Sequence, residues 1–142
     1  MREILFRGQT RRCGEKVNLK GEKLPGIWVY GGVLQCKGDF SIIYGGDSPN
    51  DINKHTVYTD TLGQYTGLTD KHGNRIFEGD IVKTDKYGTG DGQGRNFEVA
   101  VEYGGFCLRD GWRRYNLRPD DGIEVIGNIY DNPELLGGEK GE

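Results

Sequence analysis

Glycine residues are dispersed along the whole chain, and their number limits the folds that this sequence can form. There are 25 glycines in 142 residues, far above the roughly 7% of an average protein, and no Gly-x-y period accompanies them. Glycine allows the positive φ angles of tight turns and destabilises the interior of helices. The sequence therefore predicts short strands joined by turns, which the usage of valine, isoleucine, tyrosine and phenylalanine also favours.

Alternation of apolar and polar residues predicts the individual strands. The clearest half-buried strand covers residues 97–103, where large apolar side chains alternate with Glu98, Ala100 and Glu102. In 76–82, Phe77 and the Ile81 region face a core, while Glu78 and Asp80 face water or cap a turn. The remaining strands are expected at 4–7, 27–35, 39–44, 62–68, 106–108, 112–117 and 123–130.

Three segments lack a strand pattern and are predicted to be loops. Residues 8–26 are polar and basic, 45–60 combine turn residues with little apolar content, and 88–94 alternate glycine with polar residues. The one helical signal is at the end of the chain. There Asn132 can cap a helix and Pro133 suits its first position, which predicts one or two turns.

These elements indicate a mostly all-β fold. We expect a small barrel or a folded antiparallel or mixed sheet of SH3-like character, with a short C-terminal helical turn. The length favours one domain over residues 1–142. A division into an N-terminal hairpin region, 1–45, and a C-terminal barrel region, 56–136, is the alternative.

Charge and cysteine content bear on the environment of the protein. Residues 1–23 carry seven Lys or Arg against three acids, whereas residues 120–142 carry one lysine against seven acids. These ends either pair with each other, within or between subunits, or are solvated. Cys13, Cys36 and Cys107 show no CxxC pair, so we expect reduced, small buried side chains. No signal peptide or membrane-spanning stretch is present, which predicts a cytoplasmic protein.

With these segments assigned, the chain resembles the YopX family of phage and prophage proteins. The matching blocks follow the family's order and are REILFRG at 2–8, WVYG at 28–31, GQYTGL at 63–68, DKHG at 70–73, IFEGDIV at 76–82, EVIGNIY at 124–130 and NPELL at 132–136. The chain departs from the pattern in a longer polar stretch between Ile43 and Thr61 and in the 88–94 loop. The resemblance implies a phage or prophage gene expressed in a bacterial cytoplasm, a mostly β fold and no established catalytic residues.

The search for catalytic and metal-binding residues yields no site, so we expect no catalytic residues, no metal and no cofactor. The glycine loop 88–94 lacks the lysine and hydroxyl of a phosphate-binding loop. His72, with Asp70 or Asp80, is the candidate for a base, and its position in a glycine turn favours a structural role. Asp47, Asp51 and His55 form the nearest metal-like grouping, and their loop composition favours solvation. An enzyme with an unrecognised acidic or histidine site is the least favoured alternative.

The strongest binding signal is a basic and aromatic segment near residue 110. Its members are Arg109, Trp112, Arg113, Arg114, Tyr115 and Arg118. Guanidinium groups contact phosphates and aromatic rings stack on bases, which predicts local contact with single-stranded nucleic acid. Alternatively, the two aromatic rings belong to the core and the arginines extend outward or pair with the acidic tail. The overall pI of about 5.5 disfavours a nucleic-acid binder of the usual basic kind.

The sequence thus favours a non-enzymatic phage-type protein that acts by binding. Exposed strand edges and oppositely charged ends favour a homo-oligomer. A host or phage protein is a further possible partner, and nucleic acid follows as the alternative. A membrane partner is not expected.

Overall fold

A computed structural model describes residues 4–45, 53–84, 95–102, 104–111, 113–118 and 122–136, with the side chain of Gln35 excepted. The chain divides into two compact units, Met1–Tyr65 and Thr66–Glu142. The predicted loop 88–94, the acids Asp47 and Asp51, and Trp112 lie outside the described residues.

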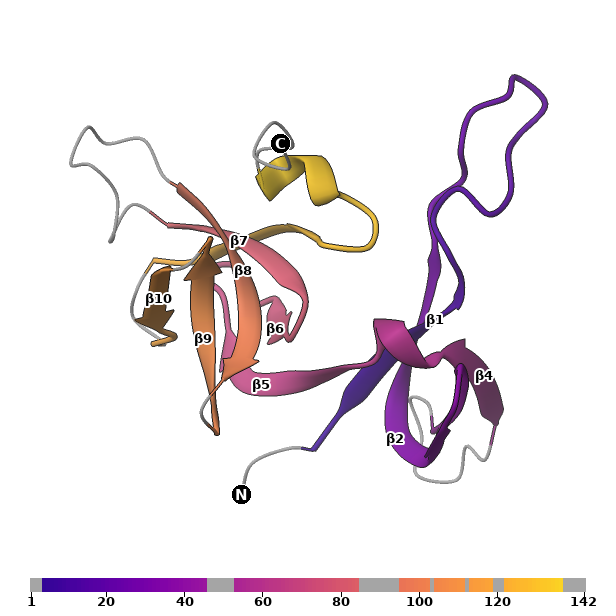
Figure 1. Cartoon of the computed structure of the whole chain (residues 1–142), viewed down its shortest axis with the longest axis horizontal. Coiled ribbons are helices and arrows are strands. Elements are labelled where there is room, and N and C mark those ends of the chain that lie inside the picture. The colour runs from indigo at the N-terminus through magenta and orange to yellow at the C-terminus, as the bar shows by residue number, and fades with distance from the viewer. Residues whose placement is uncertain are drawn as a thin grey trace. The chain divides into compact units, whose positions relative to one another are not determined.

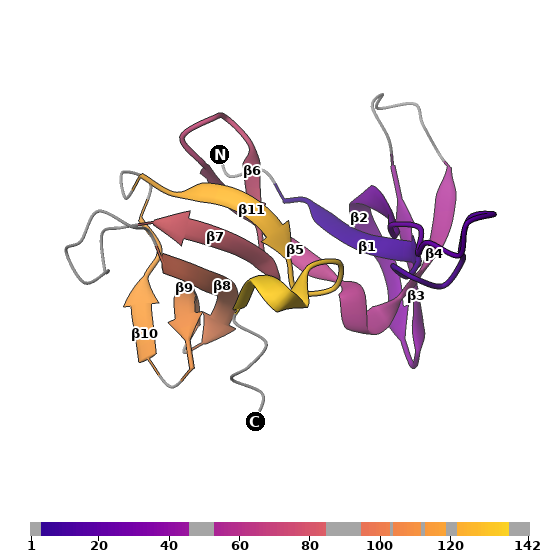
Figure 2. The ribbon, with the colours of Figure 1, turned by 90° about the horizontal axis from the view of Figure 1, so that it is seen from above.

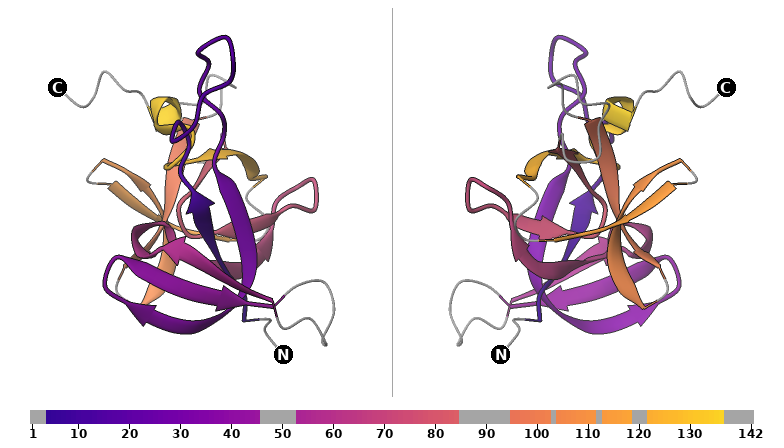
Figure 3. Two further views of the ribbon diagram at one scale, coloured as in Figure 1. Left: turned by 90° about the vertical axis from the view of Figure 1, so that its right-hand side faces the viewer. Right: turned by 90° about the vertical axis from the view of Figure 1, so that its left-hand side faces the viewer.

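The first unit is an antiparallel sheet with the strand order β4-β3-β2-β1-β5. Its elements are β1 (Phe6–Arg11), β2 (Ile27–Lys37), β3 (Phe40–Tyr44), β4 (Lys54–Tyr58), the 3-10 turn η1 (Thr59–Thr61) and the start of β5 (Gly63–Thr69). The segment between β1 and β2 extends away from the strands of this unit (Figure 3). Within it, an isolated bridge joins Val17 to Lys23.

This sheet curls so that two strands that are not ladder neighbours come into contact. A Cβ atom added at Gly8 of β1 would lie 2.8 Å from Cγ2 of Val57 of β4. Glycine at position 8 therefore permits the close approach. The backbone N–H of Gln9 also donates to Oγ1 of Thr61 at 2.9 Å. Ile43 and Val57 are buried on the inner side of the curl.

Two predictions for this region were wrong. The first strand was expected at 4–7, but β1 begins at Phe6 and continues to Arg11, through residues assigned to a loop. The strand continues past Arg7 because it pairs with β2 as far as Arg11, and the backbone N–H of Gln9 donates to Thr61. The predicted loop 45–60 contains β4, which pairs along its whole length with β3 and buries Val57. His55 therefore lies on a strand rather than in a loop.

The second unit contains the rest of β5 and a five-stranded antiparallel sheet with the order β10-β9-β8-β7-β11 (Figure 2). Its further elements are β6 (Arg75–Phe77), β7 (Asp80–Thr84), β8 (Arg95–Glu102), β9 (Gly105–Asp110), β10 (Arg113–Asn116), β11 (Glu124–Asn128) and the 3-10 turn η2 (Pro133–Leu136). Figure 1 shows β8 and β9 side by side, in agreement with their ladder.

The hydrophobic core of the second unit is continuous. Its buried members are Ile76, Val82, Phe97, Val99, Leu108 and Ile123. The alternation predicted for 97–103 is confirmed at Phe97 and Val99, whereas Val101 is 45% exposed. Burying these side chains removes apolar surface from water, which is the main force that stabilises the unit.

Two aspartates organise the turns of this unit. Asp70 accepts hydrogen bonds from the backbone N–H groups of His72, Asn74 and Val125, and thereby ties the predicted glycine turn to β11. Asp80 accepts a 2.7 Å hydrogen bond from the backbone N–H of Phe77. Asp80 is buried, so the expectation that it caps a turn is right and the alternative that it faces water is wrong.

The predicted fold class is confirmed. The described part of the chain is all-β with two antiparallel sheets, and its last element is one short helical turn, η2. Of the two predicted forms, the folded sheet describes it, since the strands in the described residues do not close into a barrel. No helix among the described residues is long and apolar enough to cross a membrane.

Candidate binding surfaces

Of the four arginines predicted to contact nucleic acid, Arg109 lies on β9, Arg113 and Arg114 lie on β10, and Arg118 follows β10. Two of them, Arg109 and Arg114, belong to a ladder of ion pairs. Arg114 stands opposite Arg109, which stands opposite Glu98 of β8, so these side chains share one face of the sheet. Arg109 contacts Glu98 at 2.8 Å and Glu102 at 3.0 Å. Arg114 contacts Glu102 at 2.6 Å. Each guanidinium is thereby matched by a carboxylate.

The ladder changes the acid–base properties of its members. The hydrogen bond from Arg114, with the further charge of Arg109, lowers the pKa of Glu102. The hydrogen bond to Glu98 raises the pKa of Arg109 despite the opposing effect of burial. Both shifts favour the charged forms. A phosphate would therefore have to displace carboxylates that already hold these arginines.

The other members of the basic segment are arranged differently. Tyr115 pairs with Leu108, and its ring meets Phe97 edge to face with centroids 5.7 Å apart. It packs against the core instead of presenting a face to solvent, as the alternative interpretation proposed. Arg113 and Arg118 are exposed. Among the described residues, the carboxylates that contact Arg109 and Arg114 are Glu98 and Glu102 of β8.

Exposed aromatic side chains gather on the outer face of the first sheet. Tyr44 of β3 stands opposite Gly32 of β2, and strand alternation places Tyr30 and Phe40 on that same face. Tyr30 is 47%, Phe40 54% and Tyr44 44% exposed. These three residues are named here the outer aromatic face. Large apolar side chains collected on one surface are typical of contact sites.

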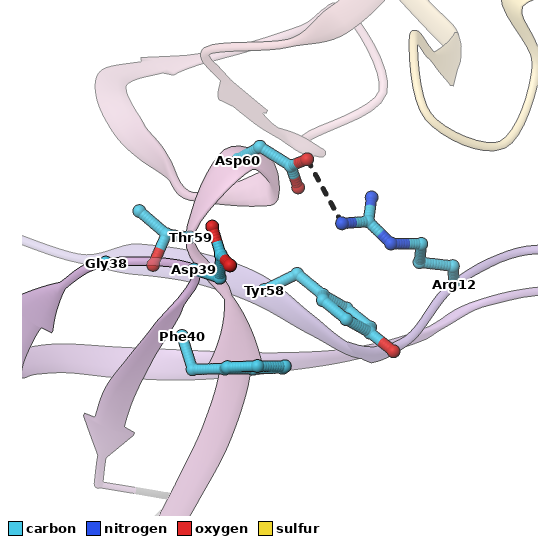
Figure 4. Close-up of a pocket in the computed structure, with 7 residues that line it drawn as sticks. All are labelled: Arg12, Gly38, Asp39, Phe40, Tyr58, Thr59 and Asp60. Atoms are coloured by element: carbon cyan, nitrogen blue, oxygen red, sulfur yellow. Dashed lines mark hydrogen bonds and ion pairs between the residues drawn. The ribbon is translucent and has the colours of Figure 1, made fainter.

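A pocket lies at the end of this face, where the β2–β3 turn meets β4 and η1 (Figure 4). Its volume is about 350 Å³, and its lining residues are Arg12, Gly38, Asp39, Phe40, Tyr58, Thr59 and Asp60. It is named here the Phe40–Tyr58 pocket. The rings of Phe40 and Tyr58 lie 5.3 Å apart because the two residues are opposite each other in the β3–β4 ladder.

Charged groups surround one of these rings. The guanidinium of Arg12 lies 4.0 Å from the centre of the Tyr58 ring and contacts Asp60 at 3.1 Å. The Tyr58 hydroxyl donates to Glu15 at 3.0 Å. This hydrogen bond raises the pKa of Tyr58, and hydrogen bonds from the backbone of Arg12 and from Tyr58 lower the pKa of Glu15.

Hydrogen bonds of η1 hold the backbone beside the pocket. The backbone N–H of Thr59 donates to the carbonyl oxygen of Asp39 at 2.9 Å. The hydroxyls of Ser41 and Thr59 are 2.7 Å apart, and Oγ1 of Thr61 donates to the carbonyl of Tyr58. The backbone on both sides of the pocket is thus held in place without a ligand.

The pocket was missed from the sequence because β4 was assigned to a loop. The residues His55-Thr-Val-Tyr58 carried the available signal, since β-branched and aromatic residues favour strands. Phe40 and Tyr58 are 18 positions apart, and Arg12 comes from a loop. Their convergence depends on the order of strands in the sheet.

The remaining candidate residues are dispersed. Cys13, Cys36 and Cys107 are free thiols; Cys107 is buried, but Cys36 is exposed, so the expectation of burial was wrong for that residue. Burial raises the pKa of Cys107, which disfavours a thiolate nucleophile there. His72 is exposed and lies 3.8 Å from Glu124. Across the described ranges, no three His, Cys, Asp or Glu side chains are grouped to hold a metal ion.

Comparison with known proteins identifies the family. The family model described as YopX protein matches residues 37–137. The chain belongs to the YopX family. The region matched extends from the end of β2 to the residue after η2, so it includes most of the pocket and the whole ion-pair ladder.

One solved structure extends this relationship over the full YopX-family chain. The crystal structure of protein EF1440 from Enterococcus faecalis is 26% identical, with a TM-score of 0.50. The match covers 96% of this chain and 99% of that one. No curated protein matches this chain.

Proposed function

We propose that this YopX-family chain is a non-catalytic phage or prophage protein of the bacterial cytoplasm, and that it acts by self-association through the outer aromatic face. The observation that carries this proposal is the exposure of Tyr30, Phe40 and Tyr44 on one side of the first sheet. Aromatic residues are enriched in protein interfaces, and soluble monomers rarely expose large apolar patches. A second copy of the chain is present as a possible partner whatever the protein concentration.

Light scattering across protein concentration tests this function. The wild-type protein is expected to show a mass above that of one chain, which falls on dilution. The double variant Tyr30→Ser, Tyr44→Ser should shift the equilibrium toward the monomer. Val101→Ser is the matched control, because Val101 is comparably exposed at 45% but lies on β8. A mass of one chain at every concentration would refute self-association.

Local nucleic-acid contact is the second candidate function. It is supported by Arg113 and Arg118, which are exposed on and after the edge strand β10. Adding a short single-stranded oligonucleotide at low salt should increase the scattering mass in a salt-sensitive manner. The Arg113→Glu, Arg114→Glu variant should abolish that increase. Equal affinity of a folded double variant would remove this candidate.

A further inference from the structure

The Phe40–Tyr58 pocket already holds one guanidinium group. Arg12 lies over the Tyr58 ring at 4.0 Å while its Nη2 contacts the Asp60 carboxylate at 3.1 Å. A guanidinium is bound favourably by an aromatic face and a carboxylate together, because the ring quadrupole and the negative charge both attract it. The pocket therefore contains an internal example of the chemistry that it can recognise.

A second aromatic ring, Phe40, and a second carboxylate, Asp39, also line the pocket. Phe40 is 54% exposed, and it follows Asp39 directly in the β2–β3 turn. Within the described part of the chain, the Asp39 carboxylate forms no hydrogen bond or ion pair, although the Asp39 carbonyl is bound by Thr59. An aromatic ring and a carboxylate thus remain available to an outside group.

The charges around the pocket select the sign of that group. Among the lining residues, the two carboxylates of Asp39 and Asp60 stand against the one cation of Arg12. Just outside the lining, Glu15 is bonded to Tyr58 and Lys37 stands opposite Phe40, so these two charges offset each other. The net negative charge attracts a cation and repels phosphate or carboxylate groups.

We propose that the Phe40–Tyr58 pocket binds an arginine side chain of a partner polypeptide. A planar guanidinium can lie against the Phe40 ring and donate two hydrogen bonds to Asp39, whereas an ammonium group acts as a point charge without this planar match. The inference goes beyond the proposed self-association because it names a different partner and adds Asp39 as its charged contact, although Phe40 belongs to both surfaces. A monomeric chain could bind arginine in the same way.

Titration with short peptides, followed by NMR of backbone amides, tests the inference. The probe is acetyl-Gly-Arg-Gly-amide at low salt, and the comparison peptides carry Lys or Glu in place of Arg. Saturable shifts are expected at the amides of Asp39, Phe40 and Thr59, with the Arg peptide binding more tightly than the Lys peptide. The Glu peptide should produce none.

Two variants and two matched controls assign the binding to the pocket. Asp39→Asn and Phe40→Leu should each lower the affinity for the Arg peptide by about two- to fivefold, which is the range expected for an exposed cation–π contact. Val101→Ser changes an exposed apolar residue of β8, outside both surfaces, and Glu134→Gln removes an exposed acid in η2. Neither control should alter the affinity.

Several outcomes would overturn the inference. These are the absence of saturable shifts at the pocket, equal affinity for the Lys or Glu peptide, and unchanged affinity in both pocket variants. Shifts of the same amides by a single-stranded oligonucleotide would assign the pocket to nucleic acid instead. Because the readout is peptide binding, a failure here is distinguishable from a failure of self-association in light scattering.

Discussion

The two units of the chain differ in how they use their large aromatic and polar residues. In the second unit, Phe97 and Tyr115 pack into a continuous core, and Arg109 and Arg114 are matched by carboxylates. In the first unit, Tyr30 and Phe40 remain exposed, while polar residues such as Gln9 and Ser41 are buried. The comparison indicates that the second unit provides most of the apolar stabilisation, whereas the first presents side chains to partners.

The largest expected effect comes from removing a core ring. Phe97→Ala should lower the free energy of unfolding of the second unit by about 3–5 kcal/mol, because it leaves a cavity in a fully buried cluster. Val57→Ala should lower the free energy of unfolding of the first unit by about 2 kcal/mol, because only two methyl groups are lost. Hydrogen exchange can follow β8–β9 and β2–β3 separately. If Phe97→Ala lowers protection equally in both regions, the two units unfold as one.

The Asp70 hydrogen bonds should give the second unit a distinct dependence on pH. Burial raises the pKa of Asp70, but the bonds from Val125, Asn74 and His72 outweigh it and lower the pKa below its usual value. Their stabilisation is therefore complete above the unfolded pKa of about 3.9 and is lost as the pH falls through the lower folded value.

Substitution of Asp70 measures this contribution. Asp70→Ala should destabilise the protein at pH 7 by about 2–3 kcal/mol, because partly buried N–H groups lose their acceptor. The difference from wild type should shrink as acid protonates Asp70. Denaturant unfolding between pH 2 and pH 7 tests this, with Glu134→Gln as the control for an exposed acid. A difference that stays constant over this range would contradict the assignment.

A smaller effect is expected where the first sheet curls. Gly8→Ala would place a Cβ atom 2.8 Å from Val57, and should cost about 1–2 kcal/mol by overpacking. Gly105→Ala is the matched control, since Gly105 also lies in a strand but has no atom within 4 Å of such a Cβ. Thermal unfolding of both variants compares them. Equal stability of the two variants would mean that the approach of residue 8 to Val57 does not require glycine.

Local sequence chemistry predicted the elements whose structure depends on near neighbours. The Asp70–Asn74 turn, the alternation at Phe97 and Val99, and the Pro133 turn follow from such chemistry. Strand β4 was missed because only Val57 is fully buried in it, and its stability depends on pairing with β3. Strands of this kind are defined by their partner more than by their own composition.

The two candidate surfaces differ in how far they could be predicted from the sequence alone. The ladder follows from the β8–β9 register, in which Gly105 stands opposite Glu102 and Glu98 stands opposite Arg109. The basic segment was instead interpreted without its acidic neighbours on β8. The pocket could not be predicted from the sequence, because Arg12, Phe40 and Tyr58 come together only when the first sheet has formed.

The alternating charges of Glu98, Arg109, Glu102 and Arg114 also have a consequence for the response of the protein to heat. Hydration of charged groups becomes less favourable as temperature rises, so the penalty for holding ions together falls. The ladder should therefore keep β8, β9 and β10 aligned on warming, when exposed neutral contacts contribute less. The outer face of this sheet would be among the last surfaces of its unit to lose order.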